Sequence, residues 1–178
     1  MITYFQSWKN ASPYNQKIYD ILKDASFKFT FKIDPNIAGL AGFMYQDSSL
    51  VFRSVDGIND AGLWEELFHA YQHHFYPGGL EAFVDYGRSN IEFEAKLYRD
   101  MLLNCCSLNN YPNIPVEILS DYEKWVNETS DYQARVPNSF ASIQERYWYF
   151  LDKFVEFSPY NYPLDYHLPD AMFHLFND

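Results

Sequence analysis

The sequence predicts an α+β protein in which a small antiparallel sheet near the N-terminus packs on a central helix, followed by a mainly helical half. Two observations predict this order. Residues 27–55 contain alternating apolar positions and short apolar segments separated by turns, which is typical of strands. From residue 61 onward, apolar residues recur at helical spacing between glycine and proline breaks. A length of 178 residues most often means one domain, so we expect a single domain over residues 1–178.

The predicted strands follow a short amphipathic helix at Asn15 to Ala25. Phe27 to Ile33 places aromatic or apolar side chains at every second position, which predicts a strand. Gly42 to Val55 contains two apolar segments on either side of Asp47-Ser48-Ser49, which predicts a β-hairpin. The strands therefore precede the central helix.

Helices are predicted for most of the remaining chain. The central helix ends at Pro77-Gly78-Gly79, because proline and glycine do not continue a helix. The tail beyond residue 157 is rich in proline and ends in a short apolar turn. The predicted segments are Ala61 to Tyr76, Ser89 or Asn90 to Asn104, Val116 to Thr129, Ser139 to Phe157, and the turn from Ala171 to Phe176.

The charge of the chain excludes two classes of partner. Its 24 acidic residues against 13 basic ones give a net charge of −11, which repels both phosphate backbones and anionic membrane surfaces. We therefore expect neither a nucleic acid nor a membrane as partner. The N-terminal segment has no signal-peptide pattern and no long apolar run occurs, so a cytoplasmic location is expected.

The central helix predicted at residues 61–76 has two faces of contrasting chemistry. One face is apolar and must meet the core. The opposite face has no lysine or arginine, although an ordinary solvated face usually has some. Glu65 and His69 are one helical turn apart, so their side chains can reach one ion together, and Glu66 is adjacent. This polar face consists of Gln72, Glu65, Tyr76, His69, His73 and Glu66.

The segment Glu65-Glu66-Leu67-Phe68-His69 resembles the H-E-x-x-H motif of zincin metallopeptidases. The downstream segment Asn90-Ile91-Glu92-Phe93-Glu94-Ala95 resembles the helix that donates the third metal ligand in the gluzincin type. The resemblance covers roughly residues 50–100 and implies a zincin-like fold. It also implies that Glu65, His69 and a downstream glutamate hold zinc, and that Glu66 is the catalytic general base in peptide-bond hydrolysis.

One position departs from the motif, because Glu65 stands where zincins have their first histidine. Two carboxylates and one imidazole form a harder site, at which zinc affinity falls and Mn or Fe become suitable. The pattern E-x-x-A points to Glu92 as the third ligand, whereas patterns ending in E-A point to Glu94; we favour Glu92 and keep Glu94 open. The departure favours a pseudoenzyme that binds a peptide or protein partner, with or without a bound metal, over an efficient protease. An active metal-dependent peptidase is the alternative.

The same residues also have purely structural interpretations. Acids near a helix N-terminus are favoured by the helix dipole, and His69 can pair with a neighbouring acid. His73 could chelate together with His69, and Ser89-x-x-Glu92 has the form of a capping box. There is no second E-x-x-H for a di-iron bundle and no G-x-S-x-G turn for a serine hydrolase. The candidate donors to a developing oxyanion are Tyr71, Tyr76, His73 and His74.

Overall fold

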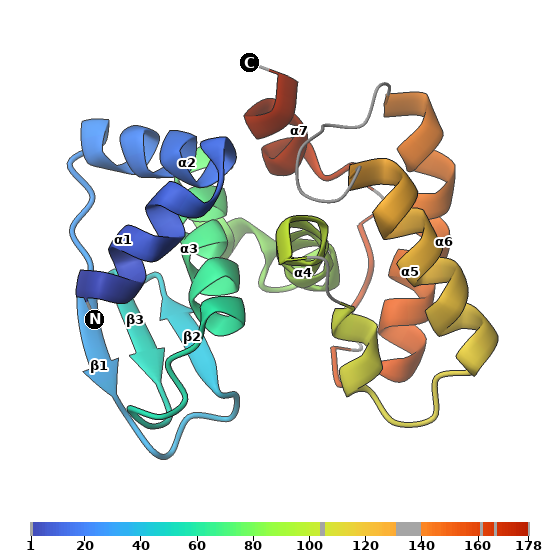
Figure 1. Cartoon of the computed structure of the whole chain (residues 1–178), viewed down its shortest axis with the longest axis horizontal. Helices are drawn as coiled ribbons and strands as arrows, with labels where there is room; N and C mark the ends of the chain where they lie inside the picture. Colours follow the sequence, from blue (N-terminus) through green and yellow to red (C-terminus); the bar gives the residue numbers. More distant parts are fainter. Residues whose placement is uncertain (1, 104–105, 131–139, 161, 166, 178) are drawn as a thin grey trace. The chain divides into compact units, whose positions relative to one another are not determined.

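The computed structural model describes residues 2–103, 106–130, 140–160, 162–165 and 167–177. The chain forms two compact units, Met1–Glu81 and Ala82–Asp178. The first contains helices and a sheet, and the described part of the second is helical, so the predicted α+β class and the helical second half are confirmed (Figure 1). The expectation of a single domain over residues 1–178 stays a prediction. In the described ranges no helix has the length and apolar character needed to cross a membrane.

Three helices build the first unit: α1 (Ile2–Ala11), α2 (Pro13–Asp24) and α3 (Asp60–Phe75). Both of the later helices start at a capping side chain. The Ser12 hydroxyl accepts a hydrogen bond from the Tyr14 N–H at 3.1 Å, and Asn59 Oδ1 accepts one from the Gly62 N–H at 2.9 Å. The predictions of α2 and α3 are confirmed, whereas α1 was not predicted.

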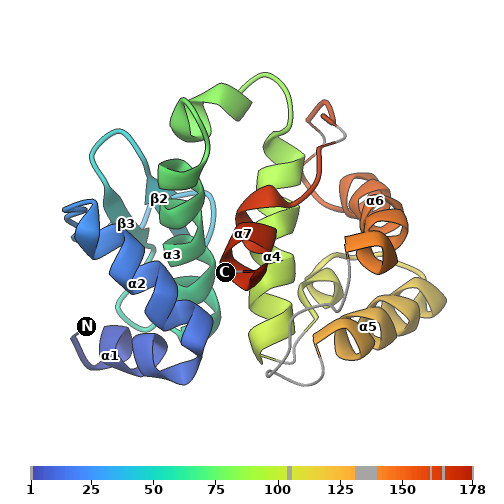
Figure 2. The ribbon, with the colours of Figure 1, turned by 90° about the horizontal axis from the view of Figure 1, so that it is seen from above.

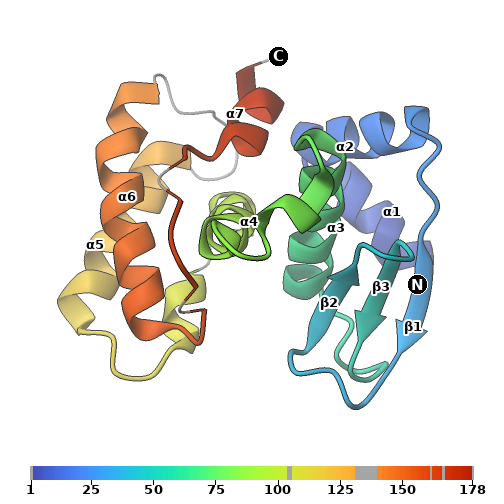
Figure 3. The ribbon, with the colours of Figure 1, turned by 180° about the vertical axis from the view of Figure 1, so that it is seen from behind.

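The sheet of the first unit consists of β1 (Thr30–Ile33), β2 (Ala41–Met44) and β3 (Ser49–Phe52), in the order β1-β3-β2. Figure 3 shows β3 between the two outer strands. The predicted hairpin is confirmed, because β2 and β3 pair antiparallel. The prediction of an all-antiparallel sheet is wrong, since β1 pairs parallel to β3.

The loop between β1 and β2 explains the parallel pairing. It carries the chain past the end of β3, so β2 joins the far edge of β3 rather than the edge where β1 lies. Arg53, directly after β3, holds this loop. Its guanidinium donates to the carbonyl oxygens of Ile37 and Ala38 at 2.9 and 2.6 Å, and its backbone N–H donates to the Leu40 carbonyl at 2.9 Å.

The core of the first unit lies between the sheet and its helices. All four residues of β3 are buried, whereas β1 is largely exposed. Helix α3 packs against β2, and α1 and α2 both pack against α3. The predicted arrangement of a sheet packed on the motif helix is therefore present within this unit.

The second unit is built around α4 (Arg88–Leu103), with α5 (Val116–Ser130) and α6 (Phe140–Phe157) on one side of it (Figure 2). Phe93 of α4 contacts Tyr122, Tyr147 and Phe154 through ring centroids 5.2 to 6.3 Å apart, which forms an aromatic core. The remaining elements are two 3₁₀ turns, Gly79–Phe83 at the border of the units and Ser107–Asn110, and α7 (Asp170–Asn177). Two predicted helix boundaries lie outside the described residues: the end of one helix at Asn104 and the start of another at Ser139.

Candidate metal-binding site

Four residues of the polar face of α3 are buried, which separates them from an ordinary solvated helix face. The exposed fractions are 7% for Glu65, 7% for Glu66, 6% for His69 and 0% for Gln72. Acidic side chains are rarely buried to this extent unless they are paired or bind a cation. The interpretation of Glu65 and Glu66 as two solvated acids at the start of a helix is therefore wrong.

Within this face, His69 is oriented by a neighbour one turn further along the helix. Its Nδ1 lies 2.7 Å from Oε1 of Gln72. Because an amide oxygen only accepts, Nδ1 carries the proton and Nε2 carries the lone pair. Histidines that bind metals commonly donate their second ring N–H in this way, which fixes the tautomer and the ring orientation. Nε2 of His69 is thus the atom prepared to bind a cation.

The helical pattern of the sequence places Gln72 on the polar face, but no role was predicted for it. The spacing of three residues between His69 and Gln72 is the signal that could have indicated a role, because it brings two side chains together on a helix. A glutamine at that distance can act as acceptor for a ring N–H. Glutamine also faces solvent in many helices, so the spacing alone does not indicate its burial.

Glu92 lies on α4 and is half-buried. The capping-box interpretation of this residue is wrong, because α4 begins at Arg88 and Ser89 is already inside the helix. The Ser89 hydroxyl donates to the carbonyl oxygen of Tyr160 at 2.8 Å instead of accepting from the start of α4. Glu92 is therefore not needed to complete a box with Ser89.

Glu94, the other candidate third ligand, is buried in the second unit at 1% exposure. Its Oε1 accepts a hydrogen bond from the Met172 N–H at 2.8 Å, in the first turn of α7. A carboxylate at a helix N-terminus satisfies an otherwise unpaired amide and interacts favourably with the helix dipole. Glu94 thus has a structural contact of its own.

The candidate site consists of Glu65, His69 and Glu92, a group that could hold a metal ion. Each residue offers one ligand atom, and these three atoms lie within 4.8 Å of one another. Glu66 and Glu94 are not part of this group. Two carboxylate oxygens and one imidazole nitrogen are donors that suit Zn, Mn or Fe.

The other histidines of α3 are placed differently. His73 accepts the Leu80 N–H at its Nδ1, 3.1 Å away, and its ring stacks on Tyr45 with a centroid distance of 5.8 Å. His74 is exposed. Tyr71, one of the candidate oxyanion donors, is 1% exposed and its ring lies against Phe68, with 5.7 Å between centroids.

The chain matches no protein family model, no curated protein and no solved structure.

Proposed function

We propose that the protein is a metallopeptidase-like protein of zincin type that binds a divalent metal through Glu65, His69 and Glu92. The observation that carries the proposal is the approach of the three ligand atoms to within 4.8 Å of one another. The hydrogen bond from His69 Nδ1 to Gln72 adds support, because it fixes the orientation of the imidazole ring and its tautomer. The donor set has two oxygens and one nitrogen, so Mn and Fe compete with Zn for it.

Metal analysis of protein purified without chelators or a nickel column tests this proposal. We expect one divalent ion per chain, and calorimetric titration of chelator-treated protein should return the same stoichiometry. Glu65→Gln and Glu92→Gln should each weaken binding at least about tenfold, because each removes a charged ligand. His74→Gln and Glu94→Gln are the matched controls and should leave the affinity unchanged. Protein that takes up no metal from excess Zn, Mn or Fe would sink the proposal.

We propose that the role of this site is to bind a peptide or protein. Catalysis is reduced because the first histidine of the motif is absent. A bound divalent ion would supply Lewis-acid chemistry there. Glu66, which is buried beside Glu65, would accept a proton if hydrolysis occurs. Hydrolysis of peptides by the metal-loaded protein is thus the second candidate function.

Two variants separate peptide binding from hydrolysis. Glu65→His restores the full H-E-x-x-H pattern, and we expect it to raise zinc affinity and peptidase activity over the natural chain. Glu66→Gln should abolish any hydrolysis and leave metal binding intact, because Glu66 is not in the ligand group. Activity of the natural chain that matches or exceeds that of Glu65→His would contradict the proposed loss of catalytic power.

A further inference from the structure

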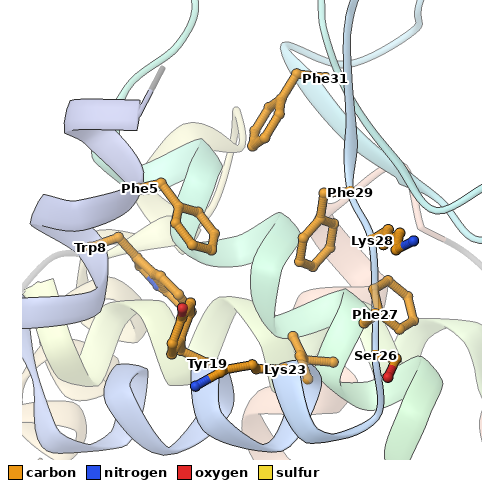
Figure 4. Close-up of a pocket in the computed structure, with 10 residues that line it drawn as sticks. Phe5, Trp8, Tyr19, Lys23, Ser26, Phe27, Lys28, Phe29 and Phe31 are labelled. Atoms are coloured by element: carbon orange, nitrogen blue, oxygen red, sulfur yellow. The ribbon is translucent and has the colours of Figure 1, made fainter.

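A pocket in the first unit is lined by aromatic rings from three segments (Figure 4). Helices α1 and α2 form one side, and the segment 26–31 that leads into β1 forms the other. Its volume is about 470 Å³, within the range of pockets that hold small organic ligands. The aromatic lining consists of Phe5, Trp8, Tyr19, Phe27, Phe29 and Phe31.

The rings around the pocket contact one another without filling it. Phe5 lies 5.3 Å from Trp8, 5.9 Å from Tyr19 and 6.4 Å from Phe29, measured between ring centroids. Phe5, Tyr19 and Phe29 are only half-buried, so each leaves part of its ring uncovered. A set of uncovered aromatic rings around one hollow favours an apolar, preferably planar, guest.

Trp8 is the most deeply buried ring of this wall. Its side chain is 1% exposed, yet its indole Nε1 has no hydrogen-bond partner in the part of the chain that the structure describes. Because this nitrogen is itself buried, Trp8 presents its ring to the pocket, and the polar side chains of the lining are Tyr19, Lys23, Ser26 and Lys28. The pocket therefore suits a guest that is apolar in its body and polar at one end.

The charge around the pocket has the opposite sign to that of the whole chain. The charged side chains that line the pocket are Lys23 and Lys28, and no acidic residue is among its described lining residues, whereas the chain has a net charge of −11. Lys23 lines the pocket and makes no ion pair with any described residue. The Lys9 ammonium lies 4.1 Å from the ring centroid of Tyr19, another lining residue. Figure 4 shows Lys23 on the side of the pocket where Trp8 and Tyr19 lie.

We propose that this pocket binds a small hydrophobic monocarboxylate. Its aromatic or alkyl body lies among the rings of Phe5, Phe27 and Phe29. Its carboxylate lies beside Lys23. The site is separate from the Glu65–His69–Glu92 group and does not depend on a metal.

Calorimetric titration of the full chain with 1-naphthoate and with laurate tests the proposal, and 1-naphthylmethanol serves as the uncharged counterpart. We expect saturable binding of one naphthoate per chain, and binding of the alcohol weaker by about twofold to fivefold, the size of an exposed ion pair. Lys23→Gln should weaken the binding of naphthoate by the same factor and leave the affinity for the alcohol unchanged. Lys124→Gln, which removes the same charge from α5, should change the affinity for neither ligand.

Nuclear magnetic resonance locates the ligand. The indole N–H signal of Trp8, assigned by its absence in Trp8→Phe, should shift as naphthoate is added. Phe29→Leu, with its fold checked by circular dichroism, should bind more weakly because it removes a ring from the wall. Absence of saturable binding, equal affinity for acid and alcohol, or shifts confined to residues outside 5–31 would each overturn the proposal.

Discussion

Asp100 is fully buried in the second unit and accepts hydrogen bonds from several donors. Its Oδ2 accepts from the Ser107 N–H at 2.7 Å, from the Ser107 hydroxyl, and from the Tyr122 hydroxyl at 2.9 Å. Arg99 lies 3.3 Å from its other oxygen. Burial raises the pKa of Asp100 above 3.8, although these donors and the Arg99 charge act in the opposite direction.

The raised pKa of Asp100 predicts a pH dependence of stability. The folded chain keeps the Asp100 proton in a pH range where the unfolded chain has lost it. The contribution of Asp100 is therefore fully present below pH 3.8 and declines as pH rises through the folded pKa. Asp100→Asn does not titrate, so its stability relative to the natural chain should improve with rising pH across that range. Urea unfolding of both proteins at a series of pH values measures this, and the reverse trend would show that the donors lower the pKa.

Two buried tyrosines form a matched pair for a second prediction. Both Tyr122 and Tyr147 are 0% exposed, but only the Tyr122 hydroxyl has a partner, Asp100. The Tyr147 hydroxyl has none among the described residues. Tyr122→Phe should lower the free energy of unfolding by about 1–2 kcal/mol, whereas Tyr147→Phe should be neutral or stabilising. Equal losses in urea unfolding would contradict this.

At the scale of elements, the Glu94 hydrogen bond attaches the first turn of α7 to α4. Glu94→Ala removes the acceptor for the Met172 N–H and should cost about 0.5–2 kcal/mol, the size of a lost helix cap. Amide hydrogen exchange in α7 should speed up. Glu92→Ala, on the same helix, is the control and should leave exchange in α7 unchanged. If both variants speed up amide exchange in α7 equally, the hydrogen bond from Met172 to Glu94 is not what stabilises α7.

The turn that ends α3 gives another prediction at this scale. Gly79 has a φ of +65°, and a Cβ there would lie 2.5 Å from Nδ1 of His73. Gly79→Ala should therefore destabilise the fold by about 1–3 kcal/mol. Gly62→Ala adds the same methyl group inside α3, where the nearest atom would be 3.5 Å away, and should stabilise by up to about 1 kcal/mol. Thermal unfolding compares the two, and a similar change in both would contradict the prediction.

The sequence predicted the elements better than their pairing. Periodic apolar positions located α2, α3, α4, α5 and the hairpin, because these depend on neighbours in sequence. Helix α1 was missed because its aromatic and polar residues follow no clear capping signal. The parallel pairing of β1 and the contact of Glu94 with Met172 depend on residues far apart in the chain, which a single sequence does not encode locally.

The candidate site, too, could be predicted from the sequence only in part. The one-turn spacing of Glu65 and His69 follows from helix geometry, so it could be predicted. The grouping with Glu92 rather than Glu94 could not be predicted. Residues two positions apart on one helix point in different directions, and only tertiary structure decides which of them meets the other ligands. The motif resemblance favoured Glu92 without excluding Glu94.

At the scale of the whole molecule, the division into two units predicts where a protease cuts. Val84 and Tyr86, just after the border at Ala82, are 48% and 66% exposed. Limited chymotrypsin digestion should therefore cleave after Tyr86 earlier than at Tyr149, which is 43% exposed but protected by the backbone of α6. Mass spectrometry of the products identifies the sites. Earlier cleavage at Tyr149 would contradict the division.

The mixed sheet also constrains the order in which the first unit is assembled during synthesis. β1 is made before the other strands, but Thr30 must wait for Ser49 to appear before it has a partner. The hairpin of β2 and β3 closes over a short turn, and such local contacts form faster than distant ones. We therefore expect β1, together with the phenylalanines that precede it, to dock last. The aromatic pocket would then exist only in the completed unit, and a ligand bound there would favour the final step of folding.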